Sequence, residues 1–461
     1  MRAIWCGAVV AAVASGCVKR VECEVHGGAG VRELVTDHFV ISSELPDAEL
    51  EAEARRLELL WDTFATFFRA EVPRARIPVV VLQDTETVAS FAEGYSGFVS
   101  RQGPRVLVVG APSEPGATNV NAHELTHLVS DFMLPRQPRW LSEGLATYFE
   151  DATFTDERTV AMGRWNKERA SEAFVGGLLS IDELMEWNDL RFDDAEARYY
   201  ASAWAWVHYL SNHDDARLVR LFDGLRGTRP VREVVREVFP PDEARRLEGE
   251  VKFYLGAAKF RGYQTSLRRA PTRSTVRTLA PWEVHRLRAQ LFLRNEKAEA
   301  EELAQAVSLA PTPLPASLAL LQAEQAKQPV ASLLASYPEA PEVLAALEDE
   351  DAKAQRPAFE RAVAASPDDA SLRLAAARAA TEAGDVVTAE THATAGLALA
   401  PWSSDLAGVL LTVAMMQRRC DEAALRLSRF EALLPEKLSE ATRKSVETLR
   451  TQVRQCGEKT P

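Results

Sequence analysis

Three equally spaced prolines constrain the fold of the C-terminal part of this chain of 461 residues. Pro367, Pro401 and Pro435 follow one another at intervals of 34 residues, and each ends an apolar helical stretch. Ala389 and Ala423 form a second pair at the same interval, where the second helix of each unit is expected to pack against the first. A repeat of this kind predicts helix pairs that stack into a solenoid, and a generic helical bundle is the alternative.

This repeat resembles the tetratricopeptide (TPR) family, although alanine replaces most of the Trp, Gly and Tyr positions of that family's pattern. Pro311 and Pro338 end earlier helices at shorter spacing and indicate degenerate repeats. We therefore expect an all-α TPR-like domain over residues 275–461, whose groove binds a protein partner.

Cys420 and Cys456 are predicted to form a disulfide. Cys420 lies at the turn before the helix that starts at Asp421, and the final helix, residues 438–456, is expected to run antiparallel to that helix. Its end therefore returns to Cys420, and an exported protein permits the bond.

The N-terminus has the pattern of an export signal. Arg2 precedes an apolar run over residues 3–14, which is too short for a comfortable membrane span. The small residues before Cys17 resemble a bacterial lipobox, in which cleavage precedes the cysteine and the thiol carries lipid. We expect a signal peptide over residues 1–16, a lipidated Cys17 that holds the protein on a bacterial envelope membrane, and a tether over residues 17–36. An ordinary cleaved signal or a weak anchor is the alternative.

The charge of the chain argues against a nucleic-acid partner. The formal net charge is -13, and no block of Lys and Arg appears outside the extreme N-terminus. Nucleic-acid binding needs a clustered basic face.

Strand and helix patterns alternate after the expected tether. Strands are expected over residues 38–42 and 77–82, and a hairpin over 97–101 and 105–109. Helices are expected over residues 47–70, 85–92, 119–133 and 139–151, and helices dominate from there to about residue 263. This order predicts an α+β domain with a mixed sheet and a helical subdomain over residues 37–265.

The segment His123-Glu124-Leu125-Thr126-His127 carries the chemistry that the sequence predicts. On a helix, residues four apart lie on one face, so His123 and His127 can bind one metal ion. Neutral imidazole suits zinc, and a catalytic zinc site takes three protein ligands and leaves the fourth position for water. Glu124 lies beside the first ligand and is expected to accept a proton from that water as the general base.

The third ligand is expected sixteen residues after His127. There Glu143 lies near the start of a helix whose buried side carries Leu141, Leu145 and Phe149. A carboxylate on an apolar packing surface is costly unless it is paired or bound to a metal. We also expect the small residue Gly144 to let this helix approach the histidine helix closely. The alternative for the two histidines is that both are satisfied core residues.

The two blocks AHELTHLV and PRWLSEGLATYFE resemble the gluzincin peptidases, specifically the peptidase-MA-like domains of bacterial exported proteins. The resemblance covers about residues 37–262. It implies a zincin-like fold and one zinc ion per chain, with His123, His127 and Glu143 as ligands and Glu124 as the general base. The substrate-amine-binding motif of the aminopeptidases is not apparent. The acid that follows the third ligand by four residues in thermolysin-like enzymes is replaced by Thr147, so a zinc histidine needs another partner.

A peptidase also needs a donor for the oxyanion of its tetrahedral intermediate. The segment from Arg198 opens a helix, and related enzymes place a tyrosine on a comparable helix. Tyr199, Tyr200 and, less strongly, His208 are therefore candidate catalytic residues, whereas an aromatic stripe that packs the helical subdomain is the alternative.

Together these patterns predict an exported, lipid-anchored zinc metallopeptidase that hydrolyses peptide bonds and recruits a protein partner or substrate through its repeats. One alternative is a non-catalytic envelope scaffold with a vestigial zinc domain. The other is a zinc-dependent hydrolase of non-peptide amides or esters.

Overall fold

The computed structural model describes most of the chain in separate ranges, and all statements below refer to them. These ranges are 30–69, 76–92, 97–100, 106–110, 120–134, 137–156, 159–187, 194–226, 229, 231–257, 263–266, 275–292, 295–347, 355–400, 403–434 and 440–458. The predicted signal peptide, Cys17 and most of the predicted tether lie outside them, as do Pro401 and Pro435. Among the helices within these ranges, none has the length and apolar composition to cross a membrane.

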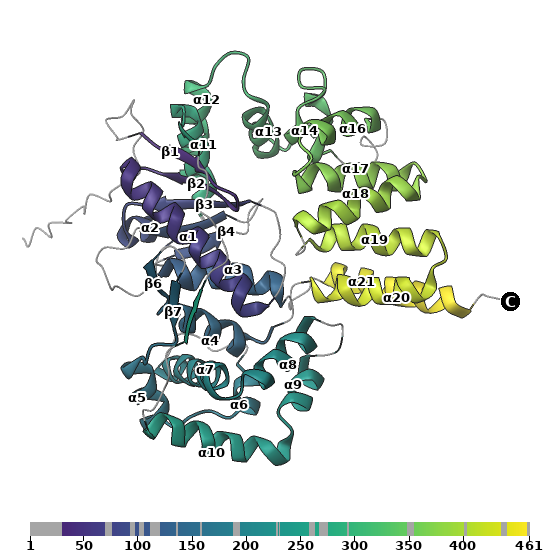
Figure 1. Cartoon of the computed structure of the whole chain (residues 1–461). Helices are drawn as coiled ribbons and strands as arrows, with labels where there is room; N and C mark the ends of the chain where they lie inside the picture. The colour runs from purple at the N-terminus through teal and green to yellow at the C-terminus, as the bar shows by residue number, and fades with distance from the viewer. Residues whose placement is uncertain are drawn as a thin grey trace, which may run out of the picture.

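A six-stranded mixed sheet forms the centre of the N-terminal part (Figure 1). Its spatial order is β4-β5-β3-β2-β1-β9, with β2, β3 and β5 parallel and the remaining pairs antiparallel. The strands are β1 (Arg32–Val35), β2 (Phe39–Ser43), β3 (Ile77–Leu82), β4 (Gly97–Ser100), β5 (Val106–Gly110) and β9 (Thr275–Thr278).

Strand β3 shows why helices cover both faces of this sheet. Successive side chains of a strand point to opposite faces. Val79 and Val81 join the large core under α1 (Asp47–Phe68) and α3 (Val120–Met133). Val80 and Leu82 join a second core under α2 (Thr85–Phe91) and α11 (Pro281–Leu291). A continuous apolar run is therefore required in a strand that is buried on both sides.

Two expectations about domain limits are wrong: the end of the tether at residue 36 and the boundary between the α+β domain and the repeat domain. Residues 32–35 form β1, which pairs with β2 on one side and with β9 on the other. The segment shows no alternating pattern because Leu34 is its only fully buried side chain. Strand β9 and helix α11, placed in the repeat domain from the sequence, complete this sheet and its second core, so the α/β body extends to residue 292.

A helical subdomain follows the sheet and contains a small second sheet that the sequence did not predict. Strands β6 (Thr153–Asp156), β7 (Thr159–Met162) and β8 (Tyr263–Ser266) form it in that order. The helices are α4 (Arg139–Phe149), α5 (Lys167–Val175), α6 (Ile181–Met185), α7 (Asp194–His213), α8 (Asp215–Arg226), α9 (Val231–Val238) and α10 (Pro241–Ala257). Helix α7 is its central element, because every side chain from Ala201 to Leu210 is buried.

The C-terminal region is helical and curves in an arc on the right of Figure 1. Its helices are α12 (Glu296–Leu309), α13 (Ala316–Gln325), α14 (Pro341–Ala345), α16 (Arg356–Ala365), α17 (Ala370–Glu382), α18 (Val386–Leu399), α19 (Ser404–Met416), α20 (Cys420–Ala432) and α21 (Glu440–Glu458). Helices α17 and α19 begin 34 residues apart, and so do α18 and α20. Ala389 and Ala423 are fully buried at equivalent positions, as the spacing predicts.

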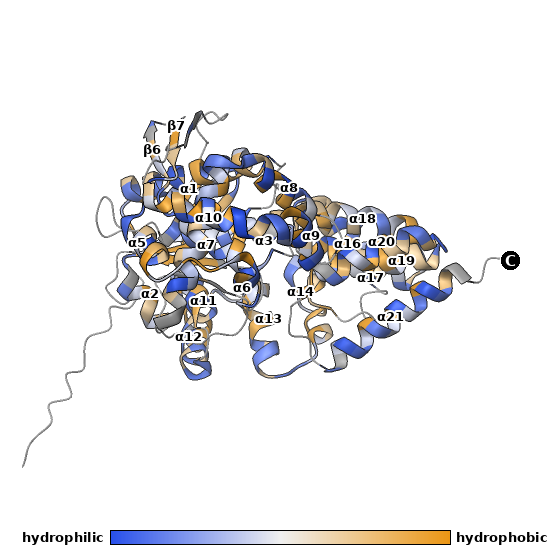
Figure 2. Cartoon of the chain, turned by 90° about the horizontal axis from the view of Figure 1, so that it is seen from below, coloured by the Kyte–Doolittle hydropathy of each residue, from blue (hydrophilic) through white to orange (hydrophobic). Residues whose placement is uncertain are grey.

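The predicted disulfide between Cys420 and Cys456 is present, with a Cα–Cα distance of 5.6 Å. It joins the start of α20 to the end of the antiparallel helix α21. Helix α21 buries few side chains, chiefly Val446 and Val453, and the rest of its surface is largely hydrophilic (Figure 2). A polar outer helix is typical of the terminal unit of a stacked array.

We expect loss of this disulfide to loosen α21, because little apolar burial holds the helix otherwise. The bond closes a loop with a sequence separation of 36, for which chain entropy predicts a stabilisation of up to about 4 kcal/mol. In the Cys420→Ser/Cys456→Ser variant, the amides of α21 should exchange with solvent faster, while those of α3 should not change. Unchanged exchange in α21 would contradict the assignment, and dithiothreitol should have no further effect on the variant.

Candidate metal centre

Helices α3 and α4 bring together three side chains that can hold a metal ion. His123 and His127 lie one turn apart on α3, and Glu143 lies in the second turn of α4. One donor atom from each residue lies within 4.8 Å of the other two. The Nε2 atoms of the two histidines are 3.2 Å apart, and Glu143 Oε2 lies 3.4 Å from Nε2 of His127 and 3.8 Å from Nε2 of His123.

The size of this triangle fits one ion in tetrahedral coordination. Zinc bonds of about 2.0–2.1 Å place neighbouring donor atoms about 3.3 Å apart. Glu143 Oε2 is also buried, and no donor within the described ranges makes a hydrogen bond to it. A buried carboxylate oxygen without such a partner is costly. A metal ion bound by the three residues would remove that cost, so the donor set fits zinc.

The second nitrogen of each imidazole is held by a residue of α4 or its C-terminal end. His123 Nδ1 lies 2.7 Å from Glu150 Oε1, and His127 Nδ1 lies 2.9 Å from Ser142 Oγ. These contacts use both Nδ1 atoms and leave both Nε2 atoms for the metal. Glu150 thus supplies the partner that Thr147 cannot, seven residues rather than four after Glu143. The sequence held this signal, since residues seven apart share a helix face.

Charges within the triad oppose the effect of burial. Burial raises the pKa of Glu143, but His127, His123 and Arg139 together hold this pKa below its ordinary value. Burial lowers the pKa of His127, yet the neighbouring carboxylates, chiefly Glu143, raise it overall. The pKa of Glu124 is raised by burial, and the two histidines offset only part of the shift. Glu124 is therefore a better proton acceptor than an exposed glutamate.

Helix α3 is anchored to α1 by a buried polar contact beside the motif. Asn121 Nδ2 donates a hydrogen bond of 2.7 Å to Glu53 Oε1, and both side chains are buried. Ala122 and Leu125, on the same helix, pack into the large core. These contacts fix the rotation of α3 and so direct His123 and His127 towards α4.

The expected role of Gly144 is corrected. A Cβ atom on this residue would lie 2.6 Å from the carbonyl oxygen of Ala203 and 2.8 Å from Cγ2 of Val207. Both residues belong to α7, so the missing side chain lets α4 approach α7 rather than the histidine helix. The glycine positions Glu143 indirectly, because it lets α4 pack closely against α7, the central helix of the subdomain.

The expected oxyanion donors lie in an aromatic cluster. The ring centroid of Trp187 lies 5.2 Å from that of Tyr199 and 5.1 Å from that of Tyr200, and the guanidinium of Arg169 lies 5.7 Å from the ring of Tyr200. Both tyrosines are partly buried against the large core. Their contacts account for an aromatic stripe, and their catalytic role stays a prediction.

The expected catalytic role of His208 is wrong. Its side chain is fully buried, and its Nε2 donates a hydrogen bond of 3.1 Å to the carbonyl oxygen of Gly163. Its Nδ1 accepts a hydrogen bond of 2.7 Å from the hydroxyl of Tyr254. Burial lowers the pKa of His208 to about 4, so the ring is neutral at pH 7. His208 is a satisfied core histidine.

One edge of the six-stranded sheet lies next to α3. The apolar strand before the motif, β5, lies inside the sheet, between β4 and β3. Strand β4 forms the edge of the sheet, and α3 packs against both β4 and β5. An extended peptide that added to this sheet on that side would therefore pair with β4.

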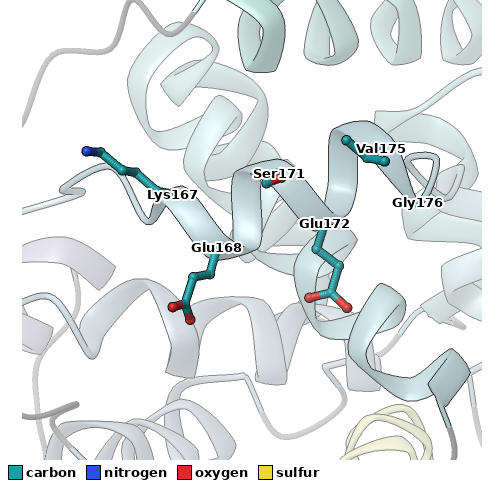
Figure 3. A pocket seen from close by; sticks show the side chains of 6 residues that line it. All are labelled: Lys167, Glu168, Ser171, Glu172, Val175 and Gly176. Carbon is teal, nitrogen blue, oxygen red and sulfur yellow. The ribbon is translucent and has the colours of Figure 1, made fainter.

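A separate, wide-open surface hollow of about 500 Å³ lies over α5 (Figure 3). The residues around it include Lys167, Glu168 and Glu172, whose side chains spread over the helix surface. None of the predicted site residues lines this hollow.

A family model matches part of the chain. The model of a family described as a protein of unknown function (DUF1570) matches residues 123–232, and this family is associated with peptidase-like domains. The match begins at His123 and includes Glu143, Tyr199 and Tyr200. A comparison with curated proteins finds no match.

We expect Gly144→Ala to destabilise the subdomain by about 1–3 kcal/mol, because the added methyl group overlaps the backbone of α7. Differential scanning calorimetry of the metal-free protein measures this effect. Gly249 of α10 gives a matched control, since a Cβ atom there meets nothing within 4 Å. Gly249→Ala should leave stability unchanged or raise it by up to about 1 kcal/mol. Equal melting temperatures for Gly144→Ala and wild type would refute the close packing.

We expect Glu150→Gln to weaken zinc affinity by about 10–100-fold, because the imidazole of His123 loses its charged partner. Glu150 lies at the C-terminal end of α4, where a negative charge opposes the helix dipole, so the variant should not weaken the helix itself. Competition with a chromophoric chelator measures the affinity. Exposed Glu168 of α5 serves as the control, and a zinc affinity equal to that of Glu168→Gln would contradict the assigned contact.

Proposed function

We propose that this chain is a zinc-dependent metallopeptidase of the gluzincin type, which holds one zinc ion through His123, His127 and Glu143. The observation that carries the proposal is the triangle formed by the three donor atoms, whose edges measure 3.2, 3.4 and 3.8 Å. One of its corners is a buried carboxylate oxygen. Two histidines and a glutamate are a donor set typical of catalytic zinc, with a fourth position left for water or substrate.

A bound zinc ion would supply Lewis acidity, lowering the pKa of a water molecule and polarising a substrate carbonyl. Glu124 takes the proton of the attacking water, since it directly follows the proposed ligand His123 on α3. The same carboxyl group can then return the proton to the leaving amine. Glu150 and Ser142 orient the imidazoles during this cycle through their contacts with Nδ1.

The sheet offers a surface for an extended substrate. Strand β4 is antiparallel to β5 at the sheet edge, and α3 packs against it. A peptide paired with β4 would run past the helix that carries His123 and Glu124, and its backbone would be recognised with little dependence on sequence. Tyr199 and Tyr200 remain our candidates for the oxyanion donor.

The remaining parts of the proposal concern location and partners. Residues 1–16 would act as a signal peptide, and lipidated Cys17 would anchor the protein to the bacterial envelope, facing the periplasm or the cell surface. The helices from α12 to α21 would form a TPR-like solenoid that recruits a protein partner or the substrate. Its helix pairs with a spacing of 34 residues support this part.

Glu124→Gln separates metal binding from catalysis. We expect wild type and Glu124→Gln each to bind one zinc ion, and cleavage of a diverse peptide library to fall by at least about 100-fold in the variant. His123→Ala should lose the zinc. Elemental analysis gives the stoichiometry, and mass spectrometry gives the products.

Each other outcome identifies a different class of protein. Zinc binding without cleavage of any library member, together with hydrolysis of simple esters or amides, would indicate a non-peptide hydrolase. Zinc binding without either activity would indicate a scaffold protein. Unchanged zinc affinity in His123→Ala would refute the metal site itself.

A further inference from the structure

The two oxygens of the Glu143 carboxylate face groups of different kinds. Oε2 points to the Nε2 atoms of His123 and His127, whereas Oε1 lies 3.9 Å from Nε of Arg139. Arg139 precedes Glu143 by four residues, so the two side chains share one face of α4. The carboxylate thus has an inner oxygen towards the histidines and an outer oxygen towards the guanidinium.

Arg139 is itself held against a buried aromatic ring. Its guanidinium carbon lies 4.5 Å from the ring centroid of Trp187, a distance typical of a cation–π contact. Trp187 is fully buried, and Tyr199 and Tyr200 pack against it at 5.2 and 5.1 Å between ring centroids. A planar cation stacked on a fixed indole loses much of its freedom, so the direction of its charge is set.

The position of Arg139 on the helix argues against a role in helix stability. Arg139 is the first residue of α4 and follows the N-cap residue Pro138. The amino end of a helix carries a partial positive charge, so a cation there is unfavourable. The contacts with Glu143 and Trp187 offset part of this cost.

We propose that Arg139, stacked on Trp187, is a positioning residue that holds the outer oxygen of Glu143 and leaves one oxygen to bind the metal. This inference rests on the proposed metal site. Without the guanidinium, the carboxylate can rotate about its terminal torsion, which has a broad energy profile. The carboxylate would then adopt several orientations, only one of which directs Oε2 towards the metal, and the affinity for zinc would fall.

The test compares two variants that differ in what they keep. Arg139→Gln removes the charge, and Arg139→Lys keeps the charge without the planar group over Trp187. The matched control is Arg169→Gln, because Arg169 also lies over an aromatic ring of this cluster, that of Tyr200, but pairs with Glu172 instead of Glu143. Zinc affinity is measured by chelator competition, and the absorption spectrum of the Co²⁺-substituted protein reports the coordination.

We expect zinc affinity to fall about 10–100-fold in Arg139→Gln, by less in Arg139→Lys, and to stay at the wild-type value in Arg169→Gln. The melting temperature of metal-free Arg139→Gln should change little, because the variant removes the unfavourable cation from the helix amino end together with the contacts that offset its cost. A purely structural role predicts the opposite pattern, with a lower melting temperature and unchanged affinity.

Failure of this inference is distinct from failure of the proposed function. If wild type binds zinc through His123 and Arg139→Gln binds it equally well with the same cobalt spectrum, Arg139 has no positioning role and the peptidase proposal is untouched. An equal loss of affinity in Arg139→Gln and Arg169→Gln would also overturn the inference, since it would indicate a general effect of charge. If wild type binds no zinc, both proposals fail.

Discussion

A buried carboxylate oxygen between two imidazoles is the interaction on which the candidate site depends. Glu143 Oε2 lies 3.4 Å from His127 and 3.8 Å from His123, and it makes no hydrogen bond within the described part of the chain. Burial of such a group is unfavourable unless a cation compensates it. The two neighbouring imidazoles supply some compensation in the metal-free protein, and a divalent ion would supply more. Because the histidines lie on α3 and Glu143 lies on α4, the rest of the domain must hold these two helices in a fixed relative position.

Several independent contacts fix that position. Gly144 lets α4 lie directly on α7, whose residues 201–210 are all buried, while Asn121 ties α3 to Glu53 of α1. Glu150 and Ser142 then link the far ends of the two imidazoles to α4 and its C-terminal end. The site is thus held from the sheet through α1 and α3, and from the helical subdomain through α7 and α4.

The predictions from the sequence succeeded where a pattern lies within one element or repeats along consecutive helices. The histidine helix, the strand at residues 77–82 and the 34-residue helix spacing are local patterns, and the disulfide follows from that spacing. The errors concern contacts between distant segments. Residues 32–35 form a strand because β2 and β9 lie on either side, which no local pattern shows. Likewise, the partner of His123 and the neighbour of Gly144 depend on how helices pack, as does the burial of His208.

The measurement that tests this account most directly is a crystal structure of the zinc-soaked protein with data collected at the zinc absorption edge. We predict one strong anomalous peak in the triangle formed by Nε2 of His123, Nε2 of His127 and Oε2 of Glu143, with bonds of about 2.0–2.1 Å. A fourth position should be open towards the side on which Glu124 lies. A peak bound by other residues, or no peak within this triangle, would contradict the account.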